Sequence, residues 1–326
     1  MAEPTVGAPE LTVVVPAFNE QESILPMYER LVAALEPHVA GLEVLFVDDG
    51  SRDATWQRVS ELAARDPRVR GIRFARNFGH QAALTAGVDA ASGRAVVIID
   101  ADLQDPPEVI PEMIARWREG YEVVYGQREQ REGETAFKKA TASAFYRLLR
   151  RITNVEIPVD TGDFRLMGPR AVAAFRSLPE RNRFIRGLVS WIGFPQIAVR
   201  YRRHARQAGE TKYPLRRMVR FALDGITSFS FLPLRLATWL GFAVSLLSFL
   251  YIVLVIVLKL LAINWPGYTS MMASILFLGG VQLVMIGVLG EYVARIFDEV
   301  KRRPLYLVGE STDGRSPVTP PLRPVT

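Results

Sequence analysis

The sequence predicts an α/β domain with a mostly parallel sheet, followed by a hairpin of two hydrophobic helices. Two observations predict the domain: short apolar runs alternate with helix-compatible stretches, and polar loops follow three of those runs. Strands that alternate with helices form parallel sheets covered by helices. A third observation predicts the hairpin, because uncharged apolar residues are concentrated between about residues 236 and 290.

The composition limits the chemistry. The 326 residues are 49% hydrophobic and 23% charged, which excludes disorder for most of the chain and favours a membrane-associated protein. There is no cysteine, so disulfides, thiolate metal sites and thiol nucleophiles are excluded. A three-histidine metal site would need all of His38, His80 and His204. Carboxylate chemistry with a hard metal ion is therefore favoured.

Four short apolar or β-branched runs predict strands, namely Leu11–Val15, Glu43–Val47, Val69–Phe74 and Ala95–Ile99. Helix-compatible stretches follow them, for example Ser23–Leu35 and Gln81–Ala91. Ligands of such folds bind at the carboxyl ends of the strands. The sequence therefore predicts that three polar loops meet at one edge: Pro16–Glu20, Asp48–Asp53 and Asp100–Gln104.

Neither a GxGxxG nor a GxxxxGK[ST] motif is present, which disfavours a dinucleotide dehydrogenase and a P-loop NTPase. Asp100 and Asp102 end an extended run two residues apart, so they project to the same side. Gln104 continues that series if the chain stays extended. Two carboxylates and an amide oxygen suit Mg²⁺ or Mn²⁺. The alternative is that these acidic residues cap a helix that begins near Pro106.

The hairpin is predicted from two uncharged runs. Leu236–Leu258 provides 23 residues, enough to cross a hydrocarbon core of ~30 Å at ~1.5 Å per residue, and Leu260–Gly290 provides the second run. Turn residues and interfacial aromatics at Asn264–Tyr268 separate spans of about 236–259 and 270–290. The alternative is a buried hairpin in a soluble core.

The remaining segments complete the domain plan. Residues 1–10 lack the pattern of a signal peptide and are expected to be disordered, as is the proline-rich tail 311–326. A catalytic domain is expected over 11–213, interfacial amphipathic helices over 135–152 and 214–234, two transmembrane helices within 235–291, and a cytoplasmic segment over 292–310. Ordinary packing on the sheet is the alternative for the amphipathic segments.

Five motifs make the sequence resemble the family 2 glycosyltransferases of the GT-A fold, and within them the polyisoprenyl-phosphate glycosyltransferases. The family motifs are Val14–Glu20, Val47–Ser51 and Asp100–Glu108, and the subgroup motifs are Asp160–Leu166 and Gly209–Tyr213. The resemblance covers about residues 11–310 and implies a Rossmann-like catalytic domain with a C-terminal transmembrane pair.

The resemblance also implies roles for individual residues. The nucleoside would be held by Pro16, Phe18, Glu20 and Asp49, and the metal ion by Asp100, Asp102 and Gln104. The catalytic group would comprise Asp102, Arg128 and Asp163, where Asp163 is a base or a positioning group and its alternative is a loop carboxylate paired with Arg165. Arg206, Arg203 or Arg202 would clamp the diphosphate, or else form a solvated basic surface, and Lys139 and Ser143 would take the acceptor phosphate.

The activity that the resemblance implies is inverting transfer of a hexose from a nucleotide-sugar to a polyprenyl phosphate. UDP-glucose is the expected donor, membrane lipid is a partner, nucleic acid is not, and a homotetramer is allowed. One alternative, a processive polysaccharide synthase, is disfavoured because Met113 stands where its Gln-x-x-Arg-Trp motif needs glutamine before Arg116-Trp117. The other is a membrane-anchored nucleotide-sugar binder without turnover.

The charges predict the orientation in the inner membrane. Eight Lys or Arg residues against one acidic residue lie between Arg200 and Arg220, and further basic residues flank both spans. The connecting stretch Leu260–Ser270 is uncharged. Because basic flanks stay in the cytoplasm, the catalytic domain and both termini are expected there.

Overall fold

The computed structural model describes residues 9–129, 161–181, 183–202, 232–261 and 267–314. The chain divides into two compact units, an α/β unit that includes the C-terminal residues from Arg302 onward and a hairpin unit that includes Leu215–Lys301. The predicted amphipathic segments lie almost entirely outside the described residues.

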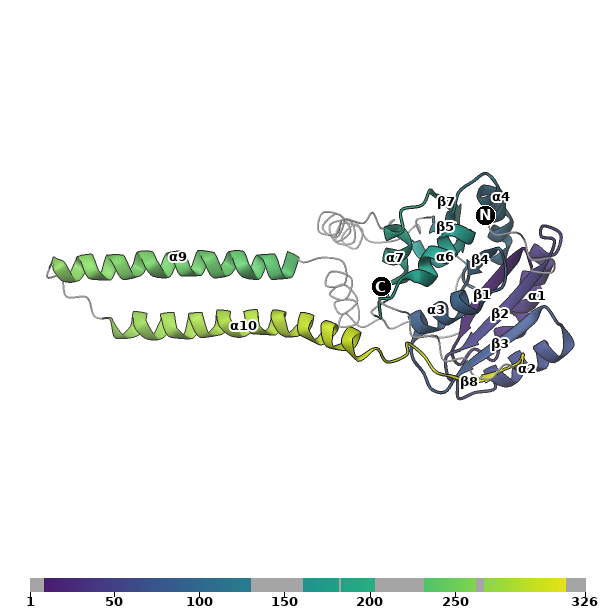
Figure 1. Cartoon of the computed structure of the whole chain (residues 1–326), viewed down its shortest axis with the longest axis horizontal. Coiled ribbons are helices and arrows are strands. Elements are labelled where there is room, and N and C mark those ends of the chain that lie inside the picture. Colours follow the sequence, from purple (N-terminus) through teal and green to yellow (C-terminus); the bar gives the residue numbers. More distant parts are fainter. Residues whose placement is uncertain (1–8, 130–160, 182, 203–231, 262–266, 315–326) are drawn as a thin grey trace. The chain divides into compact units, whose positions relative to one another are not determined.

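The described part of the α/β unit holds one eight-stranded sheet in the order β7-β5-β6-β4-β1-β2-β3-β8 (Figure 1). Strands β1 to β4 are parallel neighbours, β7 is parallel to β5, and β6 and β8 run antiparallel to their partners. The strands span, in chain order, Leu11–Ala17, Leu42–Asp48, Val69–Phe74, Ala95–Ile98, Val123–Arg128, Thr161–Met167, Gln196–Tyr201 and Val308–Ser311.

Helices cover both faces of this sheet. Helices α1, α2 and α4 pack on one face with the short η1, and α3 and α6 pack on the other (Figure 1). The helices of this unit span, in chain order, Ile24–Leu35 (α1), Thr55–Arg65 (α2), His80–Ala90 (α3), Pro107–Val109 (η1), Ile110–Arg118 (α4), Pro169–Ser177 (α6) and Ile185–Trp191 (α7).

Side-chain patterns explain these layers. Every residue of β1 and β2 is buried, as expected for central parallel strands whose two faces are both covered. Helix α1 buries Ile24, Met27, Leu31 and Leu35, one or two per turn, so a single stripe faces the core. The three-layer α/β prediction is therefore confirmed, with the strand-end loops at one edge.

Two expectations about local structure are wrong. The chain does not stay extended through Asp100–Gln104: β4 ends at Ile98 and Leu103 adopts a left-handed conformation with φ of 58°. The segment that begins at 311 is not a disordered tail throughout, because Val308–Ser311 forms strand β8 and the structure describes the chain to Gly314. No local sequence pattern predicts either feature.

The hairpin unit consists of α9 (Leu232–Leu260) and α10 (Tyr268–Lys301), which contact each other side by side (Figure 1). By length and composition, Leu234–Leu260 and Ser270–Lys301 are long and apolar enough to cross a membrane. None of either span is buried, and large side chains such as Trp239 and Phe242 are about 70% exposed. This exposure is opposite to that of a buried hairpin in a soluble core.

Candidate active site

The loops after β1 and β2 are fastened together at the carboxyl edge of the sheet. The backbone N–H of Asn19 donates to Ser51 Oγ at 2.9 Å, and Asn19 Oδ1 accepts from the backbone N–H of Arg52 at 3.0 Å. Asn19 has φ of 56°, a conformation that asparagine tolerates better than most residues. The turn leaves the preceding ring of Phe18 43% exposed at this edge.

Asp49 fastens the loop after β2 to the loop after β3. Its carboxylate accepts the backbone N–H of Phe78 at 2.7 Å and that of Gly79 at 3.0 Å, and only 3% of the residue is exposed. Gly79 has φ of 100°, which favours glycine. Asp49 is therefore buried, and its carboxylate fixes the backbone of the loop after β3 at Phe78 and Gly79.

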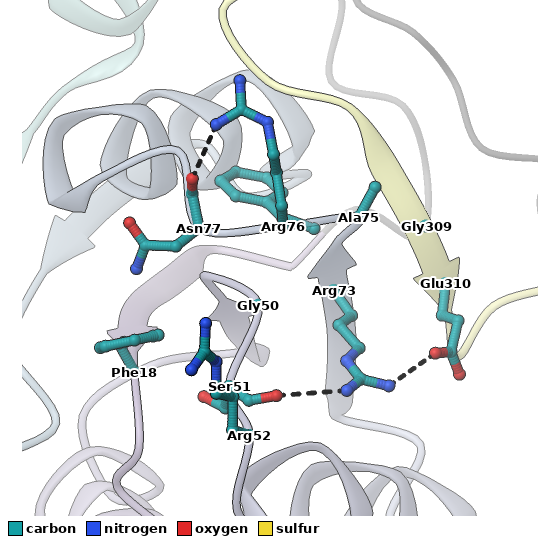
Figure 2. Close-up of a pocket in the computed structure, with 11 residues that line it drawn as sticks. Phe18, Gly50, Ser51, Arg52, Arg73, Ala75, Arg76, Asn77, Gly309 and Glu310 are labelled. Carbon is teal, nitrogen blue, oxygen red and sulfur yellow. Dashed lines mark hydrogen bonds and ion pairs between the residues drawn. The ribbon is translucent and has the colours of Figure 1, made fainter.

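A cavity of about 490 Å³ lies among these loops (Figure 2). That volume is in the range of small-molecule sites. It is lined by Phe18, Gly50, Ser51, Arg52, Arg73, Phe74, Ala75, Arg76, Asn77, Gly309 and Glu310. Three guanidinium groups beside an exposed aromatic ring suit an aromatic base that carries anionic groups.

Of the four residues predicted to hold the nucleoside, only Phe18 lines this cavity. Pro16 is buried within β1, and Asp49 holds the neighbouring loop. The Glu20 carboxylate accepts from Ser23 Oγ at 2.8 Å. The loop after β3, which supplies Arg76 and Asn77, was absent from the sequence prediction although it ends a strand at the same edge.

The predicted metal ligands lie in the turn after β4. Asp102 Oδ1 accepts the backbone N–H of Gln104 at 3.1 Å, and helix η1 has no side-chain cap, so the capping alternative is not what the structure has. Asp100 Oδ1 is buried and makes no hydrogen bond to any described residue. Burial, with the nearby Asp163, Asp105 and Asp102 carboxylates, raises the pKa of Asp100 to about 6 against the positive charge of His80.

This crowding of carboxylates fits a divalent cation, which would relieve the repulsion and occupy the unbonded oxygen. Within the described residues no three His, Asp or Glu side chains form a metal cluster. An ion held by Asp100 and Asp102 would therefore take its other ligands from the Gln104 amide, substrate phosphates and water, as Mg²⁺ commonly does.

Asp163 of β6 is the centre of a second charged group. The residue is 5% exposed, its Oδ1 lies 2.9 Å from Arg186 Nε, and its Oδ2 lies 3.3 Å from His80 Nε2 and 3.5 Å from Gln81 Nε2. Although burial favours the neutral acid, the hydrogen bond with His80 and the charge of Arg186 hold the pKa of Asp163 below its ordinary value. Arg165 donates to the backbone carbonyls of Asp163 and Gly162, whereas Arg186 pairs with the Asp163 carboxylate, so the alternative of a carboxylate paired with Arg165 is not what the structure has.

His80 links this group to the turn after β4. Its Nε2 lies 3.6 Å from Asp100 Oδ1 as well as 3.3 Å from Asp163 Oδ2. Burial opposes a charge on the ring, but the two carboxylates outweigh it and raise the pKa of His80. His80 and Arg186 were missed as site residues in the sequence. His80 follows a strand at the predicted edge, whereas nothing in the spacing marks Arg186.

Arg128 ends β5 close to the same carboxylates. Its Nε donates to Tyr201 Oη at 3.3 Å, and one terminal nitrogen lies 3.7 Å from Asp105 Oδ2. Tyr201 Oη in turn donates to Asp105 Oδ1 at 2.5 Å. The other predicted phosphate residues, Lys139, Ser143, Arg203 and Arg206, lie outside the described residues. Arg202 is described, and it pairs with Glu129 at 2.8 Å.

Comparison with known proteins covers nearly the whole chain. Residues 12–174 match the glycosyl transferase family 2 domain, and residues 232–296 match the GtrB C-terminal hairpin. The uncharacterized glycosyltransferase YkcC of Bacillus subtilis is 51% identical over 93% of this chain and 94% of its own length. The bactoprenol glucosyl transferase of Shigella phage SfII is 45% identical over 94% of this chain and 99% of its own length.

These matches extend over both units, the sheet that carries the charged edge and the apolar hairpin that makes the protein membrane-associated. The resemblance to family 2 glycosyltransferases of the polyisoprenyl-phosphate subgroup, which carry a C-terminal hairpin, is thereby confirmed. The chain belongs to glycosyltransferase family 2 and is a glycosyltransferase.

Proposed function

We propose that the protein transfers glucose from UDP-glucose to a polyprenyl phosphate at the membrane surface, with inversion at the anomeric carbon. The observation that carries the proposal is the 45% identity, over 94% of the chain, to a bactoprenol glucosyl transferase. Bactoprenol is a polyprenyl lipid, and a chain that has both an apolar hairpin and a cavity suited to a nucleotide fits one lipid and one soluble substrate.

The proposed reaction is a single displacement. An oxygen of the acceptor phosphate forms a bond to the anomeric carbon while the bond to the donor diphosphate breaks, and the electron pair leaves with the nucleotide. Asp100, Asp102 and Gln104 would hold Mg²⁺ or Mn²⁺, which when bound neutralises charge on the diphosphate. Arg128 would add a fixed positive charge near the same group, with Arg206 or Arg203 as a clamp.

The acceptor needs little help from a base. A phosphate monoester has a second pKa near ~6, so its dianion is already abundant at neutral pH. Asp163 is a weak base because its pKa is lowered. We therefore assign Asp163 a positioning role toward the sugar or acceptor, with His80 and Arg186 fixing its carboxylate. Lys139 and Ser143 are the proposed contacts of the acceptor phosphate.

The test is product identification. The full chain in detergent is incubated with Mn²⁺, a short polyprenyl phosphate and, one at a time, UDP-glucose, UDP-galactose, UDP-N-acetylglucosamine and GDP-mannose. Mass spectrometry is expected to find a polyprenyl-phosphate hexose with UDP-glucose. A polymeric product would favour a processive synthase, and donor binding without any product would favour a non-catalytic binder.

A further inference from the structure

Strand β8, which follows the hairpin in the sequence, contributes Gly309 and Glu310 to the lining of the cavity. Six residues separate its first residue, Val308, from Lys301 at the end of α10, and it pairs antiparallel with β3 in the register Arg73↔Glu310. Gly309 fits closely against β3, since a Cβ there would lie 3.2 Å from Ala75 Cα. A segment that follows the membrane helices in sequence is thus part of the α/β unit.

Glu310 joins this strand to two other elements. Its Oε1 lies 2.7 Å from a terminal nitrogen of Arg73, and its Oε2 accepts from Trp56 Nε1 of α2 at 2.9 Å. The other terminal nitrogen of Arg73 donates to the Ser51 carbonyl at 3.3 Å (Figure 2). Arg73 Nε also lies 3.4 Å from Asp48 Oδ2.

Arg73 and Glu310 line the side of the cavity across from Phe18 (Figure 2). The Ser51 carbonyl accepts a hydrogen bond from Arg73, and the Ser51 hydroxyl accepts one from the backbone N–H of Asn19, so the position of Arg73 bears on both loops that line the cavity. Without Glu310, Arg73 would keep one carboxylate partner, Asp48, and one carbonyl. The glutamate carboxylate thereby fixes an arginine that would otherwise have other rotamers open to it.

We propose that Glu310 is a positioning residue for the donor: by holding Arg73 against Ser51 it shapes the cavity for a nucleoside diphosphate. This inference rests on the proposed function only in taking a nucleotide-sugar as donor. Because Glu310 contacts Trp56 and Arg73 but, among the described residues, neither Asp100 nor Asp163, its effect is expected on donor affinity and not on the chemical step. Its side chain is 54% exposed, so its ion pair contributes little to folding.

The experiment compares Glu310→Gln with Asp313→Asn in the full chain. Glutamine keeps an acceptor for Trp56 but removes the charge that faces Arg73. Asp313 ties the same C-terminal segment to β3 through Arg70 at 3.1 Å but does not line the cavity, which makes it the matched control. Binding of UDP, GDP, CDP and ADP with Mn²⁺ is measured by calorimetry, together with kcat and the two KM values.

Glu310→Gln is expected to raise the Kd of the bound nucleotide and the donor KM about tenfold, with kcat and the acceptor KM within about twofold of wild type. Asp313→Asn is expected to change none of these values by more than about twofold. An unchanged Kd in Glu310→Gln, or equal increases in both variants, would overturn the inference. A wild-type protein that binds a nucleotide but makes no lipid-linked sugar would refute the proposed function alone, and one that binds none of the four would refute both.

Discussion

Asp100 and Asp163 lie within reach of one histidine, yet their environments drive their ionisation in opposite directions. Burial and three neighbouring carboxylates raise the pKa of Asp100, whereas His80 and Arg186 overcome burial and lower the pKa of Asp163. Carboxylates whose pKa values are driven apart commonly have different roles in one site. This contrast supports a cation beside Asp100 and a permanent anion at Asp163.

The first residue-scale prediction concerns the metal ion. Asp102→Asn replaces one of two proposed carboxylate ligands and should reduce the transfer rate by at least about a hundredfold. Excess chelator should stop wild-type transfer, and Mn²⁺ or Mg²⁺ should restore it. Glu108→Gln is the control, because Glu108 lies in the same motif but pairs with Arg30 on the surface. Full activity in excess chelator would contradict the proposed site.

The second residue-scale prediction concerns Asp163. Asp163→Asn should leave activity well above that of Asp102→Asn, because a dianionic acceptor does not depend on a general base. The expected loss is less than about a hundredfold, while removal of an essential base usually costs ~10²–10⁴-fold. Initial rates at saturating donor and acceptor decide the matter. Complete loss of transfer with both substrates still bound would instead indicate obligatory proton transfer.

At the scale of elements, the periodicity of apolar residues predicted the regular strands and helices of the α/β unit. The first four strands and helices α1 and α3 follow from apolar spacing, and the structure has them within two residues of the expected bounds. Strand β8 did not follow, since Val-Gly-Glu-Ser has no strand pattern and forms only by pairing with β3 across more than 230 residues. The turn at Leu103 was missed because a backbone with φ above zero at leucine has no sequence signal.

The site residues likewise include some that the sequence could predict and some that it could not. Strand-end loops could be located because parallel strands share a carboxyl edge, but contacts between distant segments could not. Arg186 reaches Asp163 from α7, and Asp49 turns to the backbone of Phe78 and Gly79. Such partners depend on how helices pack on the sheet, which a single sequence does not specify.

The element-scale prediction concerns Glu43, which ties strands together at the opposite edge. Its carboxylate is 7% exposed and accepts from Thr12 Oγ1 at 2.5 Å, Ser92 Oγ at 2.6 Å and Arg70 at 2.6 Å. Burial would raise its pKa, but these hydrogen bonds lower it below 4.5. Glu43→Gln should lower the apparent Tm at pH 7 by roughly 3–10 °C, for a loss of about 1–3 kcal/mol.

The sign of the pH dependence follows from the lowered pKa. Stabilisation by the Glu43 carboxylate is fully present above its ordinary pKa and is lost as the pH falls through the lower value of the folded state. The Tm difference between wild type and Glu43→Gln should stay constant from pH 7 to about pH 5 and narrow below that. Glu29→Gln, an exposed site on α1, should show no difference at any pH. A difference that widens in acid would contradict this assignment.

At the scale of the whole molecule, the reaction constrains the side of the membrane on which the α/β unit lies. The donor is soluble and the acceptor is a lipid, so transfer requires the edge of the sheet and the lipid phosphate on the same side of the bilayer. Arg235 lies at the start of the first span, Arg295 and Lys301 lie toward the end of the second, and Arg302 and Arg303 follow it, whereas only Lys259 stands near the connecting turn. From this asymmetry we propose that the α/β unit lies in the cytoplasm.

The final prediction tests that orientation by cysteine labelling, for which a chain without cysteine is suited. Tyr268, the first residue of α10 after the turn between the helices, is 73% exposed, so Tyr268→Cys should react with an impermeant thiol reagent added outside intact cells. Glu29 is exposed on α1, so Glu29→Cys should stay unlabelled until the membrane is permeabilised and then react fully. Ser51 would be a poor choice because burial alone would protect a cysteine there. The reverse pattern of labelling would place the donor site outside the cell, where the cytoplasmic nucleotide-sugar that the mechanism requires could not reach it.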